Sequence, residues 1–345
     1  MNRFERRQYK REIDLFSSTI TILKQYFPFF IKKLDALTDS RHQSYVDYSM
    51  GVITLVRLLA LLCQLNTMRQ LTDHLNTEET IQNVAELLNI TLDELPHYDT
   101  INDVFEQIDI QELRSIQKYV VTRLIRSKMF DKYRYKGKYF QIVIDGTGLA
   151  SFKFRHCKHC LKRVHNKGQK NEYTAYLHYV LEAKLVVGDI VISLDTEFVE
   201  NVTKDVEVQD CEIKAFYRMA KRIKKNYPKL AIIFSGDSLY ACMPVINICI
   251  KNKWEYIIRF KKESIKTLAE EVEGLEMVEE QEEIKYWNNL KYREVQIEEQ
   301  LNVLKYYEKK KEDITEFMWI VSFEITTKNK EELVKWRKAA MENRK

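Results

Sequence analysis

Residues 139–148 read Tyr139-Phe-Gln-Ile-Val-Ile-Asp-Gly-Thr-Gly148. This apolar run, rich in Ile and Val, ends in the acid Asp145, and a glycine follows at once. The pattern is typical of a buried strand that carries one carboxylate to the rim of a sheet, with a tight turn behind it. A second copy, Leu230-Ala-Ile-Ile-Phe-Ser-Gly-Asp-Ser238, breaks in the same way at Asp237. The sequence therefore predicts two buried strands, each ending next to an aspartate.

The two aspartates lie 92 positions apart, so only folding can bring them together. Divalent cations such as Mg²⁺ prefer oxygen ligands, and metal-assisted chemistry on phosphates needs an open coordination face. Two carboxylates at neighbouring strand ends meet both requirements. The competing interpretation is that both residues are ordinary turn acids beside glycine, which are common in loops.

Composition limits the function classes. The 345 residues, 45% of them hydrophobic, are enough for one large or two medium domains, and a net charge of +5 permits nucleic-acid binding without requiring it. Six cysteines are too few for a secreted domain built on disulfides, and the first residues lack the apolar segment of a signal peptide. The longest apolar stretch, residues 51–63, contains Arg57 and is too short to span a bilayer. We therefore expect a cytoplasmic protein without a membrane partner.

The periodicity of apolar residues divides the chain in two. Residues 1–135 carry helical spacing, which predicts an all-helical region. Residues 136–345 predict three strands in meander order, then helix, strand, helix and strand, followed by a β-rich insertion at about 265–325 and a last helix. This order is the ribonuclease H pattern. The expected fold class is thus α/β, a mixed sheet flanked by helices.

Several motifs together resemble the DDE transposases of bacterial insertion sequences, whose catalytic domain is ribonuclease H-like. Their order and spacing carry the resemblance, which covers nearly the whole chain. The motifs lie at residues 144–149 (Ile-Asp-Gly-Thr-Gly-Leu), 180–186, 210–216, 236–241 and 254–260, with further similarity at 39–43 and 98–103.

The resemblance implies a set of site residues. Asp145 and Asp237 take the places of the first two metal-binding acids. The third acid of the family is a glutamate in a segment with Arg and Trp, and the nearest match, residues 336–343, assigns Glu342 to this role. Glu294 is a rival for the third position. In the family these acids hold two Mg²⁺ ions, for which Mn²⁺ can substitute.

The implied activity is cutting and joining of double-stranded DNA at the ends of an insertion sequence. The enzyme is expected to act as a homodimer on DNA, with the helical region 1–135 helping to recognise those ends. The family continues well past its third acid, whereas this chain stops three residues after Glu342, so the final helix is expected to be incomplete. The alternative is therefore a truncated, catalytically inactive DNA-binding remnant.

Just after the first acid, residues 155–165 combine a Cys-x₂-Cys pair with three histidines. Cys157 and Cys160 have the spacing of one half of a zinc site, which His165, or else His156, would complete. A zinc-dependent binding module without nuclease ancestry is therefore a third hypothesis. The same loop is basic, and five residues in it are candidates for DNA phosphate contacts: Lys158, Lys162, Arg163, Lys167 and Lys170. Four acids on the neighbouring strands are candidates for support of the metal site: Glu182, Asp195, Glu197 and Glu200.

Overall fold

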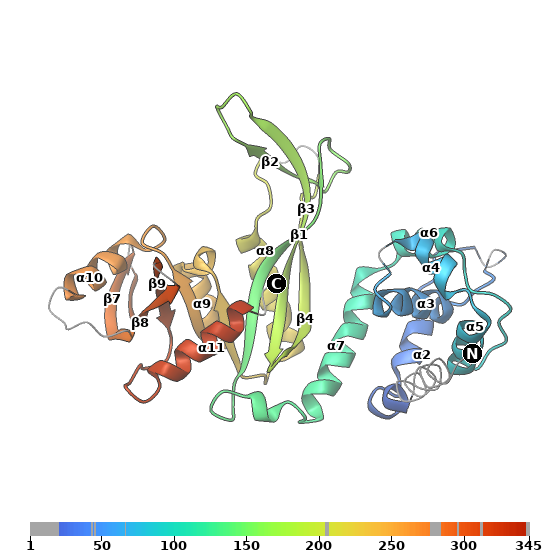
Figure 1. Ribbon diagram of the computed structural model, residues 1–345, viewed down its shortest axis with the longest axis horizontal. Helices are drawn as coiled ribbons and strands as arrows, with labels where there is room; N and C mark the ends of the chain where they lie inside the picture. The colour runs from blue at the N-terminus through green and yellow to red at the C-terminus, as the bar shows by residue number, and fades with distance from the viewer. Residues whose placement is uncertain are drawn as a thin grey trace. The chain divides into compact units, whose positions relative to one another are not determined.

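The structure is a computed structural model that describes residues 21–42, 44, 46–65, 67–203, 207–276, 284–294, 297–310 and 313–342. The chain divides into two compact units, Met1–Ser127 and Lys128–Lys345, shown in Figure 1. Each unit has its own core. Among the described helices, none has both the length and the apolar character that crossing a bilayer requires.

The first unit is helical throughout its described part and is built around the apolar helix α3. Ser49 caps the start of α3 by accepting a hydrogen bond from the backbone N–H of Val52, and most of the helix is buried. Gly51 lies so close to α2 that an added Cβ would be 2.7 Å from an oxygen of Asp35. The helices of this unit are α2 (Phe30–Asp35), α3 (Met50–Leu62), α4 (Met68–Leu75), α5 (Glu78–Leu88), α6 (Tyr98–Gln107) and α7 (Ile110–Arg126).

The second unit is organised on one nine-stranded mixed sheet with the order β2-β3-β1-β5-β6-β9-β8-β7, and β4 also pairs with β3. Strands β1, β5 and β6 are parallel, and the other pairs are antiparallel. A mixed α/β fold is thus confirmed. The strands are β1 (Phe140–Phe152), β2 (Leu161–His165), β3 (Tyr173–Val187), β4 (Ile190–Val199), β5 (Ile232–Gly236), β6 (Glu255–Phe260), β7 (Ile284–Glu294), β8 (Ile297–Lys310) and β9 (Asp313–Val321).

Helices cover both faces of this sheet. Successive residues of a strand point to opposite faces. Phe234 contacts the ring of Phe216 on α8, whereas its neighbour Ile233 belongs to an apolar cluster with Leu333 of α11. Figure 1 accordingly shows α11 in front of the sheet and α8 behind it. The helical elements are η2 (Asp131–Tyr133), α8 (Glu212–Asn226), η3 (Ser238–Tyr240), α9 (Met243–Asn252), α10 (Lys266–Glu276) and α11 (Lys330–Glu342).

The prediction of a tight turn behind Asp145 is wrong. Strand β1 continues to Phe152, and Gly146 and Gly148 pair with residues of β3 in antiparallel register. Instead of forming a turn, Gly146 allows a side chain of the neighbouring strand to pack closely against β1. A Cβ on Gly146 would lie 2.4 Å from the hydroxyl oxygen of Tyr179, so only glycine leaves room for that ring.

Ion pairs hold α8 against β4. Arg222 on α8 donates to Asp195 at 2.8 Å and to Glu197 at 2.7 Å. The side chains of both acids are almost fully buried, at 5% and 11% exposure. The arrangement satisfies two carboxylates that would otherwise be desolvated without a partner, a costly situation.

We predict that Arg222→Met lowers the free energy of unfolding of the second unit by about 3 kcal/mol, because it leaves the buried carboxylate of Asp195 uncompensated, whereas Glu197 keeps its ion pair with Arg218. All four tryptophans belong to this unit, so their fluorescence during urea titration reports its unfolding alone. Lys262→Met is the matched control, since Lys262 and its partner Glu273 are about half exposed and an ion pair in contact with solvent contributes little to stability. Equal losses in the two variants would contradict the prediction.

Candidate functional site

The register of two parallel strands brings Asp145 and Asp237 to the same edge of the sheet. Val143 on β1 is aligned with Ser235 on β5, and each aspartate lies two residues further along its own strand direction. Neighbouring strands are about 4.8 Å apart. The two acids therefore reach the carboxyl edge side by side. Asp237 also accepts a hydrogen bond from the backbone N–H of Leu239 at 2.9 Å, which fixes the chain as it leaves β5.

A third carboxylate, Glu212, joins this edge from the first turn of α8. Its charge interacts with those of both Asp237 and Asp145. All three acids are half-buried. Among the described residues, none of the three forms an ion pair with Lys or Arg. Glu212 is not among the acids predicted from the sequence, since one glutamate at the start of a helix gives no local signal of a site.

Two tyrosines hold Glu212 in place. The hydroxyl of Tyr179 on β3 donates to one carboxylate oxygen at 3.0 Å, and the hydroxyl of Tyr240 in η3 donates to the other at 3.4 Å. Both rings fit because a glycine lies under each, Gly146 below Tyr179 and Gly236 below Tyr240. The two glycines next to the aspartates in sequence therefore make room for the tyrosines that donate hydrogen bonds to Glu212.

The electrostatics of the edge favour a bound cation. Burial raises the pKa of Glu212, the negative charges of Asp237 and Asp145 raise it further, and the hydrogen bonds from the tyrosines offset part of this rise. Burial and the charge of Glu212 likewise raise the pKa of Tyr179 to about 12, so Tyr179 remains a donor at neutral pH. Carboxylate oxygens are the ligands that Mg²⁺ or Mn²⁺ prefers, and among the described residues these three acids have no Lys or Arg partner. Their oxygens do not all lie within 4.8 Å of one another, so a bound ion would have to draw them closer together.

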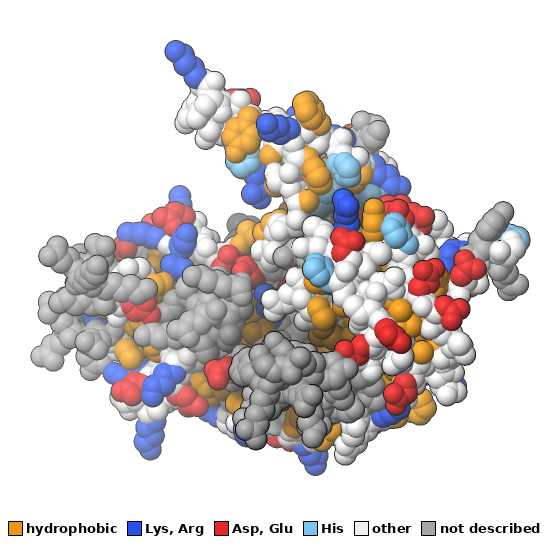
Figure 2. Space-filling view, turned by 45° about the vertical axis from the view of Figure 1, so that its right-hand side comes forward, with side chains coloured by type: hydrophobic (Ala, Val, Ile, Leu, Met, Phe, Trp, Pro, Cys, Tyr) orange, Lys and Arg blue, Asp and Glu red, His pale blue; other side chains and the backbone are white. Residues whose placement is uncertain are grey.

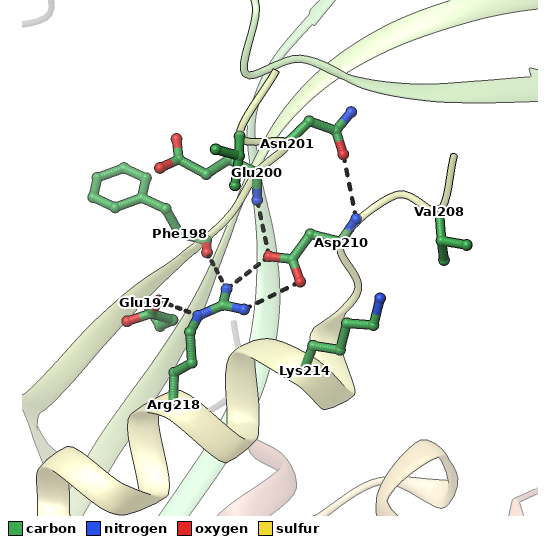
Figure 3. A pocket seen from close by; sticks show the side chains of 9 residues that line it. Glu197, Phe198, Glu200, Asn201, Val208, Asp210, Lys214 and Arg218 are labelled. Atoms are coloured by element: carbon green, nitrogen blue, oxygen red, sulfur yellow. Dashed lines mark hydrogen bonds and ion pairs between the residues drawn. The ribbon is translucent and has the colours of Figure 1, made fainter. Parts of the chain in front are cut away.

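Figure 3 shows how the segment before α8 is fixed. Asp210 lies two residues before Glu212, outside the helix. Its carboxylate accepts a hydrogen bond from Arg218 of α8 at 2.6 Å and another from the backbone N–H of Glu200 at 3.2 Å. The side chain of Asn201 accepts from the backbone N–H of Asp210 at 3.3 Å. These bonds anchor the start of α8 to the end of β4 and so position Glu212. A cavity of about 340 Å³ lies beside them.

The predicted third acid, Glu342, is the last residue of α11, and its side chain lies outside the described ones, as does that of Glu294 at the end of β7. The helix itself covers the face of the sheet on which Asp145 is placed by strand alternation. Gln141 of β1, four residues before Asp145, donates to the backbone carbonyl of Trp336 of α11 at 3.3 Å. The assignment of Glu342 stays a prediction.

The four candidate supporting acids have other partners. Asp195 and Glu197 pair with arginines of α8. Glu182 lies directly opposite Asp145 in the β1–β3 pair and forms an ion pair with Lys184 at 3.6 Å. Glu200 lies 3.5 Å from the imidazole of His159. The hypothesis that one of them supports the acids directly therefore fits only Glu182 by position.

The cysteine pair is brought to a different histidine from the one expected. Cys157, Cys160 and His178 place their ligand atoms within 4.8 Å of one another. His165 lies at the far end of β2, stacked on the ring of Tyr173, and His156 is stacked on Phe152. The choice of His165 is wrong because β2 carries it away from the cysteines, whereas the β1–β3 pairing brings His178 back to them.

These groups lie on an arm, residues 149–178, in which the outer parts of β1 and β3 extend past the rest of the sheet together with β2 (Figure 1). The arm rises at the top of Figure 2 and carries Lys and Arg side chains at its tip and along its length. All five candidate DNA-binding residues are exposed on it: Lys158, Lys162, Arg163, Lys167 and Lys170.

Comparison with known proteins finds one family. Residues 31–119, within the first unit, match the family described as DDE_Tnp_1-associated, in agreement with the resemblance noted from the sequence. The match covers well under half of the chain. No curated protein matches the sequence significantly.

Solved structures give weaker similarities. A piggyBac transposase synaptic complex with hairpin DNA is similar with 12% identity and a TM-score of 0.42, over 93% of this chain and 65% of that chain. The present chain thus spans less than two thirds of that protein. Marinitoga piezophila Argonaute, in complex with guide RNA and target DNA, is similar with 12% identity and a TM-score of 0.24, over 73% of this chain and 34% of that chain. Neither similarity is high enough to support an argument.

We predict that Glu212→Gln stabilises the metal-free protein at pH 7.5 and abolishes part of its stabilisation by Mn²⁺. The raised pKa means that the fold favours protonated Glu212, so wild-type stability falls as pH rises through that pKa. The neutral variant escapes this loss, and its melting temperature rises by roughly 2–4 °C for each kcal/mol regained.

The measurement is thermal unfolding at pH 5 and pH 7.5, with and without Mn²⁺. The difference between wild type and variant should be smaller at the lower pH, because protonation of wild-type Glu212 removes the charge that its burial disfavours. Glu263→Gln is the control. Because Glu263 is exposed, this substitution should change neither the melting temperature without metal nor its increase on addition of Mn²⁺. A variant that is less stable than wild type at pH 7.5 without metal would contradict the prediction.

Proposed function

We propose that this protein is a transposase of the DDE type, which cuts double-stranded DNA at element ends and joins them to target DNA. The observation that carries the proposal is that Asp145 and Asp237 lie at the same end of two paired parallel strands, with Glu212 near enough for their charges to raise its pKa and with no basic partner among the described residues. The match of residues 31–119 to the DDE_Tnp_1-associated family supports the same function class independently.

The proposal includes a ribonuclease H-like core. The strand order β4-β3-β1-β5-β6 supports this, since it combines antiparallel strands with the parallel strands β5 and β6, and α8 connects β4 to β5 while α9 connects β5 to β6. Strands β7, β8 and β9 then extend the sheet beyond β6 as the β-rich insertion. Cutting and joining are both displacements at phosphorus, so one site suffices for the two steps.

In this function Asp145, Asp237 and Glu212 would hold divalent ions, and Glu342 of α11 would add a fourth carboxylate. Bound Mg²⁺ supplies Lewis-acid activation of the attacking oxygen and neutralises the charge on the leaving oxygen. The chain's own task is orientation. Tyr179 and Tyr240 fix the Glu212 carboxylate, and the hydrogen bond from Leu239 N–H fixes Asp237.

The DNA is expected to contact the basic arm and the helical unit, and the protein to act as a homodimer on DNA. The competing candidate is a DNA-binding remnant without catalysis, which requires that Glu342 is not seated at the acid edge. Binding without cleavage in both Mg²⁺ and Mn²⁺ would favour that candidate.

We predict that the wild-type protein nicks a plasmid carrying its gene with the flanking DNA in Mg²⁺ or Mn²⁺. Asp145→Asn and Asp237→Asn should each lower the rate at least about 100-fold, because each removes a charged ion ligand. Asp189→Asn is the matched control, since this exposed aspartate lies in the β3–β4 turn at the opposite edge of the sheet. Cleavage that survives both substitutions would refute the proposed site.

We further predict that the double substitution Lys167→Ala and Lys170→Ala weakens DNA binding about equally for all sequences. Loss of two phosphate contacts should reduce the slope of log K against log salt by about two. Fluorescence anisotropy from low to high salt measures it. Lys225→Ala with Lys229→Ala, two exposed lysines at or just beyond the far end of α8, should leave the slope unchanged.

A further inference from the structure

The loop before β2 folds back on the arm and brings two thiols to one imidazole. Sγ of Cys157 and Sγ of Cys160 lie 3.8 Å apart. Nε2 of His178, on β3, lies 3.5 Å from the first sulfur and 3.4 Å from the second. A disulfide requires a sulfur–sulfur distance of about 2.0 Å, so the pair is not in that form.

These three distances match three corners of a zinc tetrahedron. With Zn–S bonds of about 2.3 Å and a Zn–N bond of about 2.0 Å, tetrahedral angles give roughly 3.8 Å between two sulfurs and roughly 3.5 Å between sulfur and nitrogen. The separations in this chain agree with both values to about 0.1 Å. The arrangement therefore already has the dimensions of a metal centre.

The surroundings also suit thiolate ligands. The backbone N–H of Cys157 donates to Sγ of Cys160 at 3.4 Å, as amides do around metal-bound thiolates. Cys160 is fully buried, and the ring of Phe152 packs edge-on against the imidazole of His178. In the part of the chain that the structure describes, no fourth Cys, His, Asp or Glu joins the cluster.

We propose that Cys157, Cys160 and His178 bind one zinc ion, which fastens the loop at the base of the arm to β3. This site is separate from the acid edge and does not depend on the proposed function. A bound ion would also affect the segment before Glu212, because that segment is hydrogen-bonded to the same loop. The side chain of Asn201 donates to the carbonyl of Cys160 at 3.0 Å and accepts from the N–H of Asp210.

A second link runs in parallel. The side-chain amide of Gln209 donates to the backbone carbonyl of Lys162 at 3.0 Å and accepts from the N–H of the same residue. Zinc would therefore hold the basic arm and the start of α8 to one common base. Loss of the ion should disturb both the conformation of the arm and the position of Glu212.

The test is metal analysis of the full chain, purified under reducing conditions without chelator. We expect about one zinc per chain in the wild type and less than about a tenth of that in His178→Ala. His165→Ala is the matched control, a histidine on the same arm that should keep its zinc in full. His178→Cys should restore at least half of the zinc, because a third thiolate is an equally suitable ligand. Replacement of zinc by Co²⁺ should give thiolate charge-transfer absorption in wild type, His165→Ala and His178→Cys, but not in His178→Ala.

Three outcomes would overturn the proposal: wild-type protein free of zinc with two titratable thiols at residues 157 and 160, a disulfide between them under the same conditions, or equal zinc loss in His165→Ala and His178→Ala. Asp145→Asn must retain zinc whatever its nicking activity. Failure of the zinc site is therefore distinguishable from failure of the transposase proposal.

Discussion

The parallel pairing of β1 with β5 is the constraint on which the rest of the second unit depends. Both strands are buried on two faces, with α8 and α9 on one side and α11 on the other, so their register is fixed by apolar packing. A slip by one residue would turn Asp145 to the opposite face. The fold thus sets the relative height of the two aspartates through side chains such as Ile233 and Phe234, which take no part in chemistry.

Charge is distributed unevenly along α8. Its arginines, Arg218 and Arg222, are committed to Asp195, Glu197 and Asp210, which leaves the acid at its first turn without a basic partner among the described residues. Elsewhere on this helix, buried acids are paired with arginines, whereas Glu212, Asp145 and Asp237 bring three negative charges near one another without such pairing. Departures of this kind concentrate at functional sites, because only a bound ligand makes them favourable.

The sequence predicted the two aspartates because each follows an apolar strand and touches a glycine, a signal contained within ten residues. Glu212 could not be found that way, since its partners, Tyr179 and Tyr240, lie 33 and 28 positions away. The glycine after Asp145 predicted a turn, but in the structure it makes room for an aromatic ring. The sequence does not distinguish the two roles, because both require a residue without Cβ. The same limit explains His178, which strand pairing brings to Cys157 from 21 positions away.

The arm and the acid edge are both connected to the same segment of β3. Strand β3 supplies Tyr179 to Glu212 and, one residue earlier, His178 to the cysteines. Because neighbouring residues of a strand point to opposite faces, one strand can serve the metal cluster on one side and Glu212 on the other. Asn201 then closes the loop by bonding both Cys160 and Asp210. The arm is therefore connected to Glu212 by two routes, along β3 through Tyr179 and through the hydrogen bonds of Asn201.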